Sequence, residues 1–75
     1  MEKYVSNIIP EYDLKIETDS YFDKDNNNKE MFAVKITQIS TKLEVAVHSY
    51  KGILRAYNLA MKKLEDKYIE WKNDK

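Results

Sequence analysis

Residues 31–48, MFAVKITQISTKLEVAVH, contain two stretches in which apolar and polar side chains alternate. A period of two places successive side chains on opposite faces of a β-strand. The pattern therefore predicts strands over Met31–Ile39 and Lys42–His48, and the β-branched residues in both stretches favour this structure. The side chains expected to face the core are Phe32, Val34, Ile36, Leu43, Val45 and Val47.

The short connection between these strands fixes how they pair. A turn of two or four residues around positions 40–41 sets Ile36 opposite Val45 and Val34 opposite Val47. The apolar sides of both strands then lie on the same face, so the pattern and the turn length agree. The stretch is predicted to be an antiparallel hairpin.

A third strand is predicted over Tyr12–Thr18, with its apolar side formed by Tyr12, Leu14 and Ile16. Residues 19–30, DSYFDKDNNNKE, are rich in Asp and Asn and are typical of a turn region. The core-facing residues on both sides of this region have even numbers, so direct pairing requires an odd number of loop residues. A five-residue loop over Asp23–Asn27 satisfies this condition, with Tyr21 and Phe22 still extended, and completes an antiparallel meander.

The chain from Tyr50 onward is predicted to be a helix, with Ser49 as its N-cap and residues 73–75 as a frayed tail. Apolar residues recur there in steps of three and four and form one stripe. They are Tyr50, Ile53, Leu54, Tyr57, Ala60, Met61, Leu64, Tyr68 and Trp71. The stripe and the apolar sheet face each need a partner, so we expect an α+β fold: a three-stranded antiparallel meander (β-β-β-α) with one C-terminal helix packed on one sheet face.

Residues 1–10 show no clear periodicity and are predicted to form either an N-terminal arm or a short extra strand. The face of the sheet opposite the helix would carry an apolar patch. We expect the N-terminal segment or a second copy of the chain to cover it, with bare exposure as the alternative. The patch consists of Met31, Ala33, Ile39 and Ala46.

The 75 residues are enough for one small domain, expected to span 1–75. The chain has no Cys, one Gly and one Pro, which excludes disulfide-stapled, thiolate-metal and collagen-like proteins. No apolar run has the roughly 20 residues of a membrane helix, and residues 1–4 do not resemble a signal peptide. We therefore expect a cytoplasmic protein with no membrane partner.

Catalytic, cofactor and metal sites are not expected. His48 is the only histidine and is predicted on the outer sheet face near Glu44 and Lys42, where a solvated strand residue is expected in place of a general base. Asp23–Asn27 begins like a calcium loop, but position six is Asn28 and position twelve is Val34 instead of Gly and Glu. A phosphate-cradling loop would need more than one Gly. The sequence therefore predicts a protein that is not an enzyme and has no cofactor.

Charge is divided between the two halves of the chain. Residues 1–30 contain four Lys against eight Asp and Glu, and residues 31–75 contain nine Lys and Arg against five Asp and Glu. The acidic residues form a candidate surface for a basic partner, or a charged edge that prevents aggregation of strands. The candidates are Glu11, Asp13, Glu17, Asp19, Asp23, Asp25 and Glu30.

The predicted helix carries a second candidate surface opposite its apolar stripe. Lys51, Arg55 and Lys62 follow one line, together with Asn58, that could neutralise phosphates, and an ordinary solvated helix face is the alternative. Leu59 projects from the same side and is a candidate anchor for a protein partner. Tyr68 and Trp71 are candidate aromatic anchors near the end of the helix.

Two functions are consistent with these surfaces. The first is a non-enzymatic protein-binding module, of the kind that a phage or mobile element uses to modulate or inhibit a host enzyme. The Lys- and Asn-rich composition is typical of a low-GC bacterium or its phages. The alternative is a small nucleic-acid-binding protein that uses the basic helix face Lys51/Arg55/Lys62. A homodimer that binds neither ligand is a third alternative, because it would add buried surface to a small core.

Overall fold

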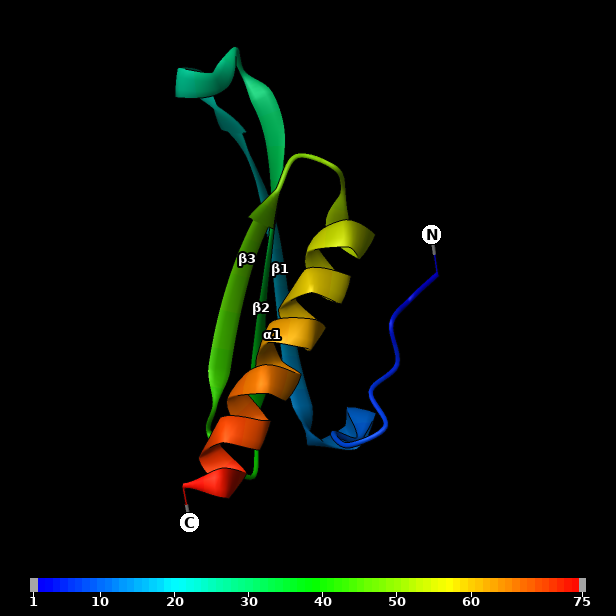
Figure 1. Ribbon diagram of the computed structural model, residues 1–75. Helices are drawn as coiled ribbons and strands as arrows, with labels where there is room; N and C mark the ends of the chain where they lie inside the picture. The colour runs from blue at the N-terminus through cyan, green and yellow to red at the C-terminus, as the bar shows by residue number, and fades with distance from the viewer. Residues whose placement is uncertain (1, 75) are drawn as a thin grey trace.

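A computed structural model describes residues 2–74 and confirms the predicted three-stranded meander followed by one C-terminal helix. The sheet order is β1-β2-β3, and both pairs of neighbours are antiparallel (Figure 1). Two single turns of 3-10 helix, η1 and η2, flank β1. In chain order the elements are η1 (Glu11–Asp13), β1 (Leu14–Asp23), η2 (Lys24–Asn26), β2 (Lys29–Gln38), β3 (Glu44–Ser49) and α1 (Ile53–Asn73).

The β2–β3 hairpin has the predicted register. Ile36 lies opposite Val45, and Val34 lies opposite Val47. The predicted start of the third strand at Lys42 is wrong, because Lys42 has a left-handed φ of 63° and its N–H donates to the carbonyl of Gln38. This residue belongs to the turn, and β3 begins two residues later.

β1 differs from its prediction at both ends. The predicted strand position of Tyr12 is wrong: it lies in η1 with its side chain 86% exposed. The N–H of Asp13 donates to the carbonyl of Pro10, which closes a turn before the strand begins. At the other end β1 continues to Asp23, beyond the alternating stretch that ends at Thr18 and one residue beyond the segment of Tyr21 and Phe22 that was predicted to be extended.

The β1–β2 loop has the predicted length but begins one residue later than Asp23–Asn27. Asp23 pairs with Lys29, so the five residues 24–28 form the connection. The Asp23 carboxylate accepts a hydrogen bond from the N–H of Asp25, and Asn27 and Asn28 both adopt left-handed φ angles. Asn tolerates this conformation better than other residues that carry a Cβ. The even-numbered side chains of β1 and β2 therefore lie on the same face of the sheet, as the sequence predicted.

α1 begins at Ile53, three residues later than predicted. The assignment of Ser49 as N-cap is wrong, because Ser49 is the last residue of β3 and its hydroxyl accepts from the N–H of Lys51. Gly52 takes the cap position with φ 115° and ψ 165°, where a side chain is strained. Tyr50 is exposed and precedes the helix. α1 ends at Asn73, Asp74 follows it, and Lys75 lies outside the described residues.

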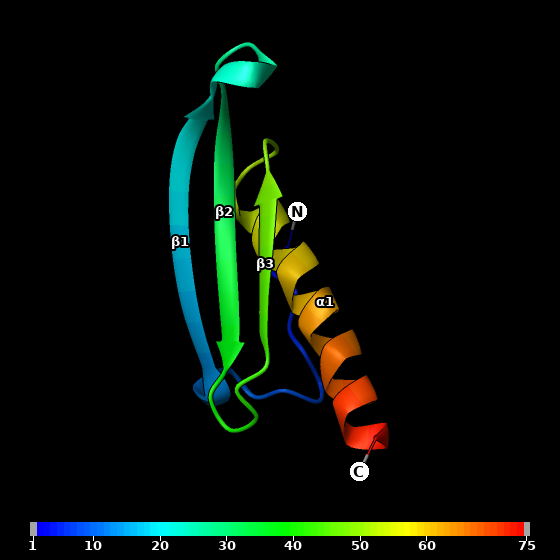
Figure 2. The ribbon, with the colours of Figure 1, turned by 90° about the vertical axis from the view of Figure 1, so that its left-hand side faces the viewer.

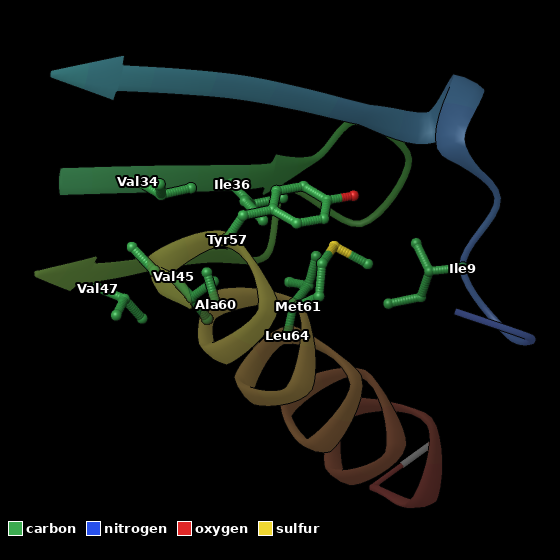
Figure 3. Close-up of a cluster of buried hydrophobic side chains, with 10 residues drawn as sticks. Ile9, Val34, Ile36, Val45, Val47, Tyr57, Ala60, Met61 and Leu64 are labelled. Atoms are coloured by element: carbon green, nitrogen blue, oxygen red, sulfur yellow. The ribbon is translucent and has the colours of Figure 1, made fainter. Parts of the chain in front are cut away.

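α1 packs mainly on β2 and β3 (Figure 2). A helix with its side chains is about 10 Å wide, and strands are about 4.8 Å apart, so one helix covers about two strands. The buried side chains of the two strands meet the predicted helical stripe in the core (Figure 3). The buried hydrophobic residues are Ile9, Val34, Ile36, Val45, Val47, Ala56, Tyr57, Ala60, Met61 and Leu64.

Residues 2–10 form an extended arm beside α1, on the helix side of the sheet (Figure 1). The Asn58 side chain holds this arm by accepting from the N–H of Tyr4 and donating to the carbonyl of Glu2. Ile9 enters the core, and Tyr4 packs against it. The expectation that the arm covers the outer sheet face is therefore wrong, because its apolar residues complete the core beside the helix.

Leu64 tests the position of the core. Its side chain is fully buried at the centre of α1. Leu64→Ala should lower the free energy of unfolding by about 2–5 kcal/mol, because the truncation leaves a cavity. Leu59→Ala, on the exposed side of the same helix, should change it by less than about 0.5 kcal/mol. Urea denaturation measures both, and equal stabilities of the two variants would contradict this core.

Asn27 tests the hairpin loop. The sequence predicts little cost for Asn27→Ser unless Asn27 holds a left-handed turn, and the structure gives it φ 59° and ψ 34°. Asn27→Ser should therefore cost about 1 kcal/mol, while Asn27→Gly should be close to neutral. Thermal denaturation distinguishes them, and equal melting temperatures would show that the loop does not require this conformation.

Candidate functional site

β1 is the part of the sheet that the rest of the molecule leaves bare. Every residue from Lys15 to Phe22 is exposed, although these residues point alternately to both faces. On the helix side, the 43% exposure of Ile16 and the 67% exposure of Phe22 show that α1 does not cover the middle of this strand. Thr18 and Ser20 separate these two apolar residues and add little apolar area for a core. β1 therefore offers both its faces to solvent.

The outer face of β1 is acidic at its centre. Glu17 lies opposite Lys35 of β2, and Asp19 lies opposite Ala33. The Glu17 carboxylate also lies 3.7 Å from the Lys15 ammonium, but both side chains are more than half exposed, so this ion pair contributes little. The Asp19 carboxylate accepts only a local hydrogen bond from the N–H of Ser20 among the contacts described. Both carboxylates remain accessible to a partner.

A shallow hollow of about 400 Å³ lies on this outer face, over the small side chains of Ala33 and Ala46. Glu17, Asp19 and Lys35 line it together with His48. His48 lies on the outer face, as predicted. Its Nδ1 is 3.1 Å from the hydroxyl of Tyr21, and this contact spans β2. The hollow contains charges of both signs and is open, so it has the character of a docking surface more than of a catalytic pocket.

Asp13 is an acidic candidate that the fold itself uses. Its carboxylate accepts hydrogen bonds from the N–H and hydroxyl of Ser40 and from the side-chain amide of Gln38. The hydroxyl of Ser40 has the largest effect on the pKa of Asp13, and together these bonds hold it below its ordinary value of 3.8. These contacts tie the start of β1 to the β2–β3 turn.

Asp23 and Asp25 lie at the far end of the sheet. The carboxylate of Asp23 caps η2 by accepting from Asp25, and both residues belong to the protruding β1–β2 hairpin (Figure 2). The structure therefore brings Glu17 and Asp19 together on β1, but it gives Asp13 and Asp23 structural hydrogen bonds at the two ends of the strand.

The predicted basic line does not lie on one helix. Lys51 precedes α1 and places its ammonium 5.9 Å from the ring centre of Tyr50. Arg55 and Lys62 do lie on α1, beside exposed Leu59, and line a hollow of about 220 Å³. The Lys62 ammonium is 5.8 Å from the ring centre of Tyr4 in the N-terminal arm. The arm therefore occupies part of this surface.

The aromatic candidates at the end of α1 pack on each other. The rings of Tyr68 and Trp71 are stacked with centres 5.9 Å apart, and Tyr68 also packs against the core. Both are half-buried. Within residues 2–74 no three His, Asp or Glu side chains are grouped so that they could hold a metal ion, and no helix combines the length and the apolar character needed to cross a membrane.

The sequence indicated the charges of β1 and the extended conformation of Tyr21 and Phe22, but it did not indicate that neither face of the strand is covered. Thr18 and Ser20 carried the available signal, because polar residues on both sides of a strand indicate that neither face is buried. Comparison of the chain with protein-family models, curated proteins and solved structures finds no match in any of the three.

The hydrogen bonds of Asp13 predict a pH dependence. Because its pKa is lowered by folding, Asp13 stabilises the protein above the unfolded-state value near 3.8, and this stabilisation is lost as the pH falls through the folded-state pKa. Asp13→Asn should reduce the loss of stability between neutral and acidic pH. Urea denaturation across this range measures the change, with Glu30→Gln as the control for the loss of one carboxylate. Parallel profiles for Asp13→Asn and the parent protein would contradict the prediction.

Proposed function

We propose that the chain is a non-enzymatic protein-binding module that docks through β1, of the kind a phage or mobile element uses to modulate a host enzyme. The observation that carries the proposal is the exposure of residues 15–22 on both faces of an ordered strand. A strand in a single-domain protein normally buries at least one face, because this burial stabilises the sheet. β1 lacks most of this stabilisation, and a partner that covers β1 would supply it.

The charges of β1 favour a basic partner. Glu17 and Asp19 lie on the outer face beside the hollow over Ala33. Complementary charges raise the rate of association and exclude partners of the wrong sign. Because the net charge of the chain is zero, the attraction for a basic partner is confined to this part of the surface. A strongly acidic protein would attract basic molecules over its whole surface.

Nucleic-acid binding through Lys51, Arg55 and Lys62 is the alternative function, and it has less support. Lys51 lies outside α1, and Lys62 contacts the N-terminal arm. This alternative requires a gel shift at low salt that Arg55→Glu with Lys62→Glu abolishes and that added salt weakens steeply. The homodimer remains a prediction that sedimentation at two concentrations tests.

A pull-down with charge-reversed variants tests the proposed function. The immobilised parent protein should retain a stoichiometric partner from a bacterial extract, and Glu17→Lys with Asp19→Lys should lose it, because the new charges repel a basic surface. The matched control is Asp66→Lys with Glu70→Lys on the exposed side of α1, which changes the net charge equally and should retain the partner.

Two results would contradict the proposal. One is equal retention of the partner by both charge-reversed variants, which would place binding elsewhere. The other is the absence of any stoichiometric protein, and a gel shift that depends on Arg55 and Lys62 would then favour the alternative function.

A further inference from the structure

The free edge of β1 is open along most of its length. The N–H of Ile39 donates to the carbonyl of Asp13, so residues 13 and 39 form a hydrogen-bonded pair. Such pairs alternate with non-bonded pairs in an antiparallel ladder. Odd-numbered residues of β1 therefore bond to β2, and even-numbered residues such as Thr18 and Ser20 direct their N–H and C=O groups away from the sheet. Figure 2 shows no segment beyond β1 on this side.

The two faces beside this edge differ in chemistry. On the helix side lie Ile16 and Phe22, both with large exposed apolar area. Thr18 and Ser20, which lie between them, line a hollow of about 360 Å³ together with Phe32 of β2 and Ile53 of the first turn of α1. On the outer side Glu17 and Asp19 lie at the centre, between Lys15 and Tyr21. A strand added at this edge would meet apolar surface with one set of alternate side chains and carboxylates with the other.

We propose that β1 binds an extended segment of a partner protein as a fourth strand, and that this segment alternates apolar and basic residues. The inference rests on the proposed function and names the chemistry of its partner. Main-chain hydrogen bonds to the even-numbered residues of β1 would hold the segment. Its apolar side chains would cover Ile16 and Phe22, and its basic side chains would face Glu17 and Asp19.

Charge argues against a second copy of the chain as the occupant. An antiparallel pairing of β1 with itself, centred on Thr18, sets Glu17 of each copy opposite Asp19 of the other. A register centred on Glu17 or Asp19 sets that carboxylate against its own copy. The register centred on Ile16 does set Lys15 opposite Glu17, but it pairs only residues 14–18, because β1 begins at Leu14, and it leaves residues 19–22 without a partner strand. Like charges directly opposite each other destabilise a strand pair. The same carboxylates that disfavour self-pairing attract a basic strand.

The test uses the full chain and a labelled, acetylated and amidated peptide, KVKVKVK, in fluorescence anisotropy. The two control peptides are EVEVEVE, with the opposite charge, and KKKKVVV, with the same composition but no alternation. The parent protein should bind KVKVKVK at least tenfold more tightly than either control. Glu17→Lys with Asp19→Lys should reverse the preference between KVKVKVK and EVEVEVE.

A proline variant separates strand addition from attraction by charge. Thr18→Pro removes an N–H that points to the open edge and leaves the ladder to β2 intact, a position at which an edge strand tolerates proline. It should weaken KVKVKVK binding at least tenfold, while Thr18→Val, which keeps the N–H, should bind like the parent. Circular dichroism checks the fold. If Thr18→Pro does not fold, Ser20→Pro makes the same change two residues along the same edge.

Three results would overturn strand addition. They are equal binding of KVKVKVK by the folded proline variant and the parent, equal binding of KKKKVVV and KVKVKVK, and a dimer of the protein alone that the proline variant dissociates. The first two results would contradict strand addition alone. If the pull-down still retains a partner that depends on Glu17 and Asp19, the proposed function remains supported. Failure of the proposed function itself appears in the pull-down, as retention that does not depend on these two residues.

Discussion

The width of one helix beneath three strands is the constraint on which the structure depends. α1 covers β2 and β3, where Val34, Ile36, Val45 and Val47 meet its apolar stripe, and it cannot also cover β1. The N-terminal arm fills the space beside the helix with Ile9, but it does not lie over β1. β1 is therefore held by backbone hydrogen bonds to β2 and by contacts at its ends. β1 is the most exposed strand of the sheet because one helix is too narrow to cover all three strands.

The β2–β3 hairpin could be predicted because two independent constraints agree there. A short turn and two regular apolar alternations leave one register that brings Val34 and Val47 together. β1 could not be predicted as well, because Thr18 and Ser20 give its middle no apolar side, and register is weakly specified in such strands. The pair Asn27 and Asn28 decided the loop position through backbone conformations that composition alone does not assign.

The part of the candidate site that depends on alternation along β1 could be predicted from the sequence. The outward position of Glu17 follows from alternation along β1. The use of Asp13 as a hydrogen-bond acceptor for Ser40 depends on a contact between residues 27 positions apart, which the pattern of neither segment shows. The same holds for Asn58, which appeared to be part of a solvated helix face and instead secures the N-terminal arm. Long-range polar contacts of this kind decide which charged residues remain available to a partner.

Gly52 illustrates how one backbone position links sheet and helix. A Cβ built at Gly52 would meet no atom within 4 Å, so the strain of a substitution would come from the φ of 115° and not from lack of space. For a residue of mirror-image chirality, the same angles lie at the border of the extended region. A D-alanine placed there by chemical synthesis would therefore fit with less strain than L-alanine and would restrict the unfolded chain. The handedness of one α-carbon determines which residues can join the two layers.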